Sequence, residues 1–146
     1  MLNLTKKWAL LLGFATCLAL PLTAVIPLPQ ELQAVEAPPF VMTEETSIVT
    51  ALAFRAEAEI AAEELRRSTG FALPVVDAGA EFALPAIFFQ KDTTIDGCEA
   101  YALEVRSQQV MIRAATPAGA FYGYQTFRQL LPPQVYSRTK RPGVKW

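Results

Sequence analysis

Two pairs of adjacent carboxylates are the residues of this sequence whose spacing best suits acid–base chemistry. Glu44 is followed by Glu45, and Glu63 by Glu64, and two carboxylates with different pKa values form the acid and base of many hydrolases. The first pair falls in a polar turn and the second on a charged helix face near arginines, settings that keep both carboxylates of a pair ionised. We therefore predict that both pairs lie on a solvated surface and that the chain has no catalytic residues.

Cysteine and metal chemistry have little support in the sequence. The 146 residues include two cysteines, Cys17 and Cys98, and no histidine. Without an imidazole to act as its base, Cys98 is predicted to be a small half-buried residue in a turn, not a nucleophile. A zinc site would also lack its commonest ligand. We expect no disulfide, no metal site and no cofactor.

Length and composition indicate a single folded domain and argue against a nucleic-acid partner. The chain has 13 Lys and Arg against 14 Asp and Glu, and 52% of its residues are hydrophobic. These values fit one domain with a buried core. The basic residues are paired with acids on one helix or gathered near the end of the chain, so no basic face is available for phosphates. We predict no nucleic-acid partner.

The first part of the chain has the pattern of an export signal. Residues 1–24 begin with a short segment that ends in Lys6 and Lys7, followed by an uncharged apolar run over 8–20. That run is shorter than the roughly 20 residues that span a bilayer core. We predict cleavage near Ala24, export to the periplasm or the extracellular space, and no membrane span after cleavage. An uncleaved anchor is the alternative.

The segment 25–131 is predicted to form an α+β domain with two α-helices packed on one face of an antiparallel sheet. It opens with an extended, proline-rich arm. Apolar and polar residues alternate over the last two strands, as in a hairpin with one wet face, and Pro74 favours an edge position for its strand. The predicted strands are 40–42, 47–50, 73–76, 86–89, 101–106 and 110–114.

Two segments have helical patterns. The first covers 51–68, is capped by Gly70, and carries its charges on the wet side. Its predicted buried face is Ala53, Ala56, Ile60, Ala61 and Leu65. The second runs from the N-cap Thr116 to about Leu131. It is apolar on more than one side, so its aromatic and leucine residues are candidates for a domain interface. The candidate residues are Phe121, Tyr122, Tyr124, Phe127, Leu130 and Leu131.

Two further features of the sequence are a pair of glycines on the second helix and a proline-rich tail after it. Gly119 and Gly123 allow another backbone to approach closely, which suits either packing on the domain's own sheet or contact with a partner. The tail, 132–146, contains three prolines and four basic residues, and we predict that it is a linker.

Three stretches together resemble the N-terminal accessory domain of glycoside hydrolase family 20, the β-N-acetylhexosaminidases. They are 26–30, 62–76, and 99–105 with its continuation at 119–132; the last includes a Gly-x-x-Tyr-Gly-x-Gln-Thr-x-x-Gln-Leu-Leu-Pro string. The resemblance implies that the two helices lie between the sheet and a (β/α)8 catalytic barrel, which comes after the tail. It also implies that an Asp-Glu pair in the barrel, absent from this chain, performs the hydrolysis of terminal N-acetylhexosamine with the substrate's acetamido group as nucleophile.

The preferred hypothesis is therefore a non-catalytic domain of an exported β-N-acetylhexosaminidase, inactive alone. Two alternatives remain. One is an exported module that docks through its aromatic helix to a protein or a glycan without enzymatic activity. The other is the equivalent accessory domain of a different glycosidase, such as an α-glucuronidase or an O-linked-glycan hydrolase.

Overall fold

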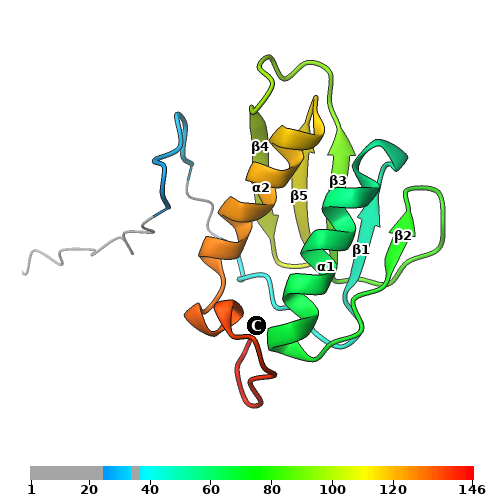
Figure 1. Ribbon diagram of the computed structural model, residues 1–146, viewed down its shortest axis with the longest axis vertical. Coiled ribbons are helices and arrows are strands. Elements are labelled where there is room, and N and C mark those ends of the chain that lie inside the picture. Colours follow the sequence, from blue (N-terminus) through cyan, green and yellow to red (C-terminus); the bar gives the residue numbers. More distant parts are fainter. Residues whose placement is uncertain (1–24, 34–36) are drawn as a thin grey trace, which may run out of the picture.

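The computed structural model describes residues 25–33 and 37–146, so the predicted signal segment 1–24 lies outside the described residues. It contains a five-stranded sheet with two helices on one face (Figure 1). The strands are β1 (Ser47–Thr50), β2 (Val75–Asp77), β3 (Ala86–Lys91), β4 (Tyr101–Arg106) and β5 (Gln109–Ala114). The helices are η1 (Leu52–Phe54), α1 (Arg55–Thr69), α2 (Pro117–Leu130) and η2 (Pro133–Tyr136). The α+β class is confirmed.

The sheet is mixed, so the prediction of an antiparallel sheet is wrong. Its order is β2-β1-β3-β5-β4, and β1 runs parallel to β2 and β3, as β3 does to β5. Among the described strands only β4 and β5 pair antiparallel. A helical crossover through α1 returns the chain in the same direction, which makes β1 and β2 parallel. Ile48 and Val49, adjacent on β1, are both buried, as is typical of a central parallel strand.

Other strand predictions have mixed outcomes. The hairpin is confirmed, although its turn is only Ser107 and Gln108 because Gln109 already pairs with Arg106. The strand after Pro74 lies at the sheet edge, as predicted. Residues 40–42 form no strand, so that prediction is wrong.

The buried face of α1 differs from the prediction because the helix starts later and has another phase. A 3-10 turn precedes it and ends at Phe54, which is fully buried. Phe54 fixes which side of the helix faces the sheet, since it is larger than the alanines that come after it. Ile60 is consequently 42% exposed, and Ala53 and Ala56 are exposed too. The buried residues on α1 are Ala58, Ala61, Ala62, Leu65, Ser68 and Thr69.

The glycines of α2 face the domain's own sheet. A Cβ atom at Gly123 would lie 2.6 Å from Ile112 Cγ2, and one at Gly119 would overlap the carbonyl oxygen of Ala100. A larger residue at either position would push α2 off β4 and β5. The helix start is as predicted, because Thr116 Oγ1 accepts a hydrogen bond from the Gly119 amide at 3.1 Å. Of the two alternatives for these glycines, the structure shows intramolecular packing.

The packed unit extends beyond residue 131. Val135 and Trp146 are buried at 3% and 4% exposure and belong to the core. The tail predicted as a linker is therefore folded onto the domain, because it carries two apolar side chains that reach core positions. Within the described residues no helix has the length and apolar character needed to cross a bilayer.

Candidate domain interface

The six predicted interface residues of α2 and its end divide into core and surface. Tyr124 and Phe127 are each 1% exposed, and the ring of Phe127 meets that of Phe40 edge-on, with centroids 6.1 Å apart. These two side chains have no surface to offer a partner. Tyr122 is 42% exposed and Leu130 39% exposed. The remaining two, Phe121 and Leu131, are half-buried.

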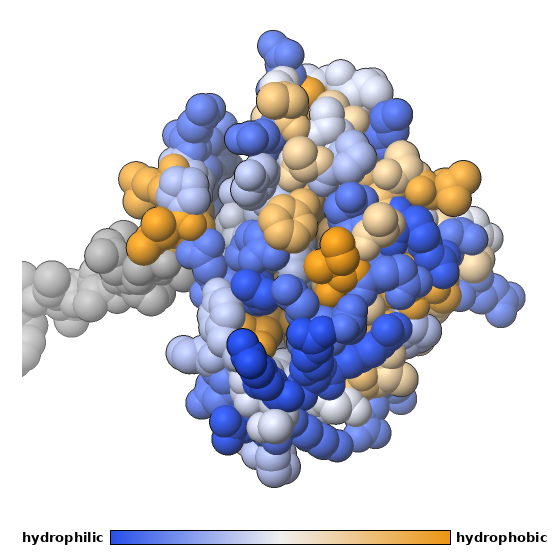
Figure 2. All heavy atoms as spheres, viewed as in Figure 1, coloured by the Kyte–Doolittle hydropathy of each residue, from blue (hydrophilic) through white to orange (hydrophobic). Residues whose placement is uncertain are grey.

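Ile60 of α1 adds a further exposed apolar side chain to the same layer of the fold. The two helices lie side by side over the sheet (Figure 1). We define the outer helix surface as Ile60, Phe121, Tyr122, Leu130 and Leu131. Figure 2 views the molecule from the helix side and shows hydrophobic residues interspersed with hydrophilic ones, not one continuous patch. Interfaces between domains are about as apolar as the rest of a protein surface, so this mixture does not by itself mark an interface.

A polar cluster joins α1, α2 and η2. The Glu64 carboxylate accepts a hydrogen bond from the Tyr124 hydroxyl at 2.8 Å and forms an ion pair with Arg128. The guanidinium carbon of Arg128 lies 4.8 Å from the ring centroid of Tyr136, within the range of a cation–π interaction. The prediction that Glu64 is solvated is therefore wrong, because its side chain is 32% exposed and already has two partners.

The electrostatics of this cluster suit a structural clamp. Burial, together with the hydrogen bond to Glu64, raises the pKa of Tyr124 well above its ordinary value, so the phenol stays protonated and donates. Burial alone would lower the pKa of Arg128, but the negative charge of Glu64 outweighs it and the pKa is raised. The buried Nε of Arg128 has no hydrogen-bond partner among the described residues. The Glu64 carboxylate thus links α1 to two side chains of α2, Tyr124 and Arg128.

The other predicted chemical residues are at the surface. Glu44 and Glu45 are exposed, and Glu63 is exposed and pairs with Arg67, as predicted for a solvated surface. Cys98 is exposed, not half-buried. In the part of the chain that the structure describes, no three His, Cys, Asp or Glu residues are grouped as metal ligands would be.

The N-terminal arm is attached to α2 by a reciprocal pair of hydrogen bonds. The Ile26 amide donates to Gln129 Oε1 and Gln129 Nε2 donates to the Ile26 carbonyl, each at 2.9 Å. Val25 is 5% exposed, whereas Ile26 and Leu28 are 76% and 84% exposed. The arm is thus fixed at Ile26 to the last turns of α2, while the side chains of Ile26 and Leu28 stay exposed. Sequence reasoning missed this contact, because nothing in the local pattern links residues that are 103 positions apart.

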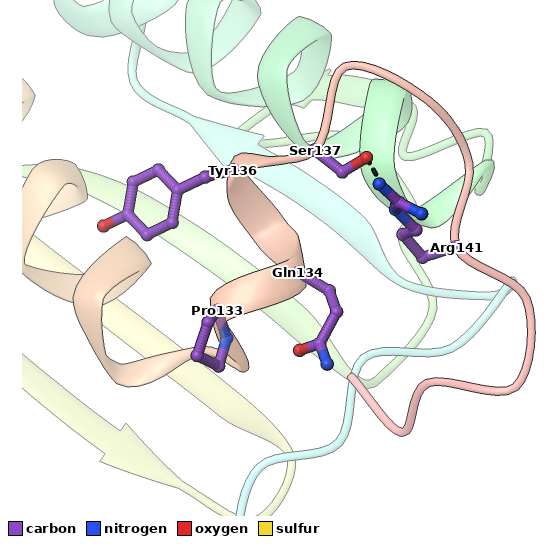
Figure 3. A pocket seen from close by; sticks show the side chains of 5 residues that line it. All are labelled: Pro133, Gln134, Tyr136, Ser137 and Arg141. Atoms are coloured by element: carbon purple, nitrogen blue, oxygen red, sulfur yellow. Dashed lines mark hydrogen bonds between the residues drawn. The ribbon is translucent and has the colours of Figure 1, made fainter.

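An open depression lies at the end of α2. It is lined by Pro133, Gln134, Tyr136, Ser137 and Arg141 (Figure 3). Arg141 Nε donates to Ser137 Oγ at 2.8 Å, and Figure 3 shows the Tyr136 ring directed away from both. A ligand site needs polar groups that converge on one volume. This depression lacks that arrangement.

Comparisons with known proteins show similarity to β-hexosaminidases of glycosyl hydrolase family 20. Residues 22–144 match the family Glycosyl hydrolase family 20, domain 2. A β-hexosaminidase of Porphyromonas gingivalis is 34% identical over 114 residues, which are 77% of this chain and 14% of the relative. The structure of the β-N-acetylhexosaminidase of Streptomyces coelicolor A3(2) is similar at 34% identity and a TM-score of 0.72, over 85% of this chain and 24% of that one. The N-acetyl-β-hexosaminidase of Streptomyces plicatus is similar at 33% identity and a TM-score of 0.65, over 75% of this chain and 21% of that one. The chain therefore spans a quarter or less of the length of these relatives.

Proposed function

We propose that this chain, which belongs to glycosyl hydrolase family 20, is the non-catalytic accessory domain of an exported β-N-acetylhexosaminidase. The observation that carries the proposal is the extent of the match. Residues 22–144 correspond to that family's domain 2, so almost the whole packed unit is accounted for by one domain of the family. The fold agrees, since 85% of the chain superposes on 24% of a β-N-acetylhexosaminidase.

The proposed partner is the (β/α)8 catalytic barrel of the parent enzyme. Tyr122 and Leu130 are 42% and 39% exposed, and Ile60 on the neighbouring helix is similarly open. The resemblance to family 20 implies that the two helices lie between the sheet and the barrel, and these exposed side chains lie on that helix layer. The outer helix surface, together with the exposed Ile26 and Leu28 of the arm, is the area that we propose the barrel covers. In this role the domain stabilises and shapes the barrel and does not contact the sugar.

The proposed reaction of the parent enzyme is the hydrolysis of terminal N-acetylhexosamine. It needs a carboxylic acid that protonates the leaving oxygen, with a raised pKa. Among the paired glutamates Glu64 has the most enclosed side chain, and that carboxylate is already occupied by its ion pair with Arg128 and its hydrogen bond from Tyr124. We therefore assign the acid and the substrate site to the barrel. The proposal of export rests on Lys6 and Lys7 and on the apolar run 8–20 that follows them.

Turnover by the chain alone is the test of this assignment. The exported product, whose first residue is expected to be Val25, is assayed on a chromogenic N-acetylglucosaminide beside the Streptomyces coelicolor enzyme. We expect the positive control to release chromophore and the chain to show only the buffer rate, because the acid is elsewhere. A rate above buffer that is lost in Glu64→Gln but kept in Glu63→Gln would place catalysis in this domain and overturn the proposal.

A further inference from the structure

The end of the chain is held at several points along its length. We define the strap as residues 133–146. At its start, Val135 is 3% exposed in the core, and the neighbouring Tyr136 ring lies over the Arg128 guanidinium. This first anchor connects the strap to the last turn of α2, since Arg128 belongs to that helix and is itself paired with Glu64 of α1.

The middle of the strap contacts the C-terminal end of α1. The Arg141 amide donates a hydrogen bond to the Ser68 carbonyl at 2.8 Å, one of the carbonyls left without a helical partner at a helix end. The side chain of Lys140 covers Gly70, where an added Cβ would lie 2.5 Å from Lys140 Cδ. Gly70 thus supplies both the left-handed cap, with φ 74°, and the space for the lysine stem.

The last residue of the strap is anchored at the entrance to β1. Trp146 is 4% exposed, and its carbonyl accepts a hydrogen bond from the Met42 amide at 2.8 Å. Met42 is itself 2% exposed. Figure 1 places the C-terminus at the end of the molecule where α1 and α2 both end. The strap therefore runs from α2 past the end of α1 to the segment that leads into β1.

We propose that the strap is a rigid coupling segment that fixes the exit point of the chain relative to the helix layer. The presence of a catalytic barrel after Trp146 rests on the proposed function; the docking of the strap does not. A flexible linker has few apolar residues and no buried backbone bonds, whereas the strap buries Val135 and Trp146 and uses two backbone hydrogen bonds to distant elements. A fixed exit point holds the next domain against the outer helix surface instead of tethering it loosely.

The fluorescence of Trp146 reports strap docking directly. The chain has two tryptophans, so Trp8→Phe in the full chain leaves Trp146 as the single tryptophan, which is excited selectively over the tyrosines. We expect a blue-shifted emission and an acrylamide quenching constant at least about fivefold below that of the same protein in guanidinium, because a buried side chain is reached only through local opening. An emission maximum and quenching constant equal to those of the unfolded protein would overturn the proposal.

A matched pair of strap variants tests whether the strap docks as a unit. Val135→Asp places a carboxylate at a buried position and should raise Trp146 quenching several-fold while far-UV circular dichroism keeps its helical signal. Gln134→Asp adds the same charge at the neighbouring exposed residue and should leave quenching unchanged.

If Val135→Asp stays folded and Trp146 stays protected, the strap does not act as one unit and the proposal fails. If Val135→Asp unfolds, the test of strap docking is the quenching of Trp146 in the Trp8→Phe protein, compared between its folded and unfolded states. If the chain shows no turnover but Trp146 is quenched as in the unfolded protein, the proposed coupling role of the strap is wrong and the proposed function stands.

Discussion

Phe127→Ala is expected to lower the free energy of unfolding by about 3–5 kcal/mol, the range for removing a buried aromatic ring. Phe127 is 1% exposed and its ring meets Phe40 edge-on, so truncation leaves a cavity between α2 and the N-terminal part of the chain. The measurement is equilibrium unfolding in denaturant, followed by circular dichroism at a fixed pH.

Leu130→Ala is the matched control for Phe127→Ala. It truncates an apolar residue on the same helix, but one that is 39% exposed, and is expected to cost less than about 1 kcal/mol. A large difference between the two variants supports the division of α2 into core and interface residues. Equal losses would show that Leu130 is a core residue and that the outer helix surface is wrongly defined.

Glu64→Ala is expected to destabilise the domain by about 2–3 kcal/mol. The loss is smaller than the 3–5 kcal/mol of a fully buried pair, because the side chains of Glu64 and Arg128 are 32% and 21% exposed and solvent screens part of their attraction. The variant leaves the Arg128 guanidinium without its counter-charge and the Tyr124 hydroxyl without its acceptor. Thermal and denaturant unfolding measure the loss.

Glu63→Ala removes the adjacent carboxylate as a control. Glu63 pairs with Arg67 on the exposed side of the helix, with side-chain exposures of 67% and 54%. A surface pair of this spacing contributes about 0.3–0.5 kcal/mol. If both variants lose the same small amount, Glu64 is a solvated residue after all and the clamp between α1, α2 and η2 is not structural.

The main elements of the fold were predictable because their signals are local. Thr116 and Pro117 mark a helix start, Gly70 marks a helix end, and both are in place in the structure. The direction of the strands was not predictable from alternation alone. In 47–50 the adjacent apolar residues Ile48 and Val49 break the alternation, and a strand buried on both faces is typical of the centre of a parallel sheet. The phase of α1 was missed because Phe54, which fixes it, lies in the 3-10 turn before the helix.

The candidate site was less predictable, because it depends on contacts between distant residues. An apolar helix shows how much surface needs covering but not which residues its own sheet covers, so the buried Tyr124 and Phe127 could not be separated from the exposed Leu130. Glu64 is 60 residues from Tyr124 and 64 from Arg128. No pattern within α1 distinguishes it from Glu63. The strap was missed for the same reason, since its prolines and basic residues are typical of a linker.

The central claim, that this chain is the accessory domain of a hexosaminidase, is tested most directly by domain replacement. The matched domain of the Streptomyces coelicolor enzyme, which this chain covers over 24% of that protein, is deleted or replaced by residues 25–146. We predict that deletion removes turnover of a chromogenic N-acetylglucosaminide and that replacement restores it. A folded replacement enzyme with no more turnover than the deletion would contradict the account and favour a module that docks to a different partner.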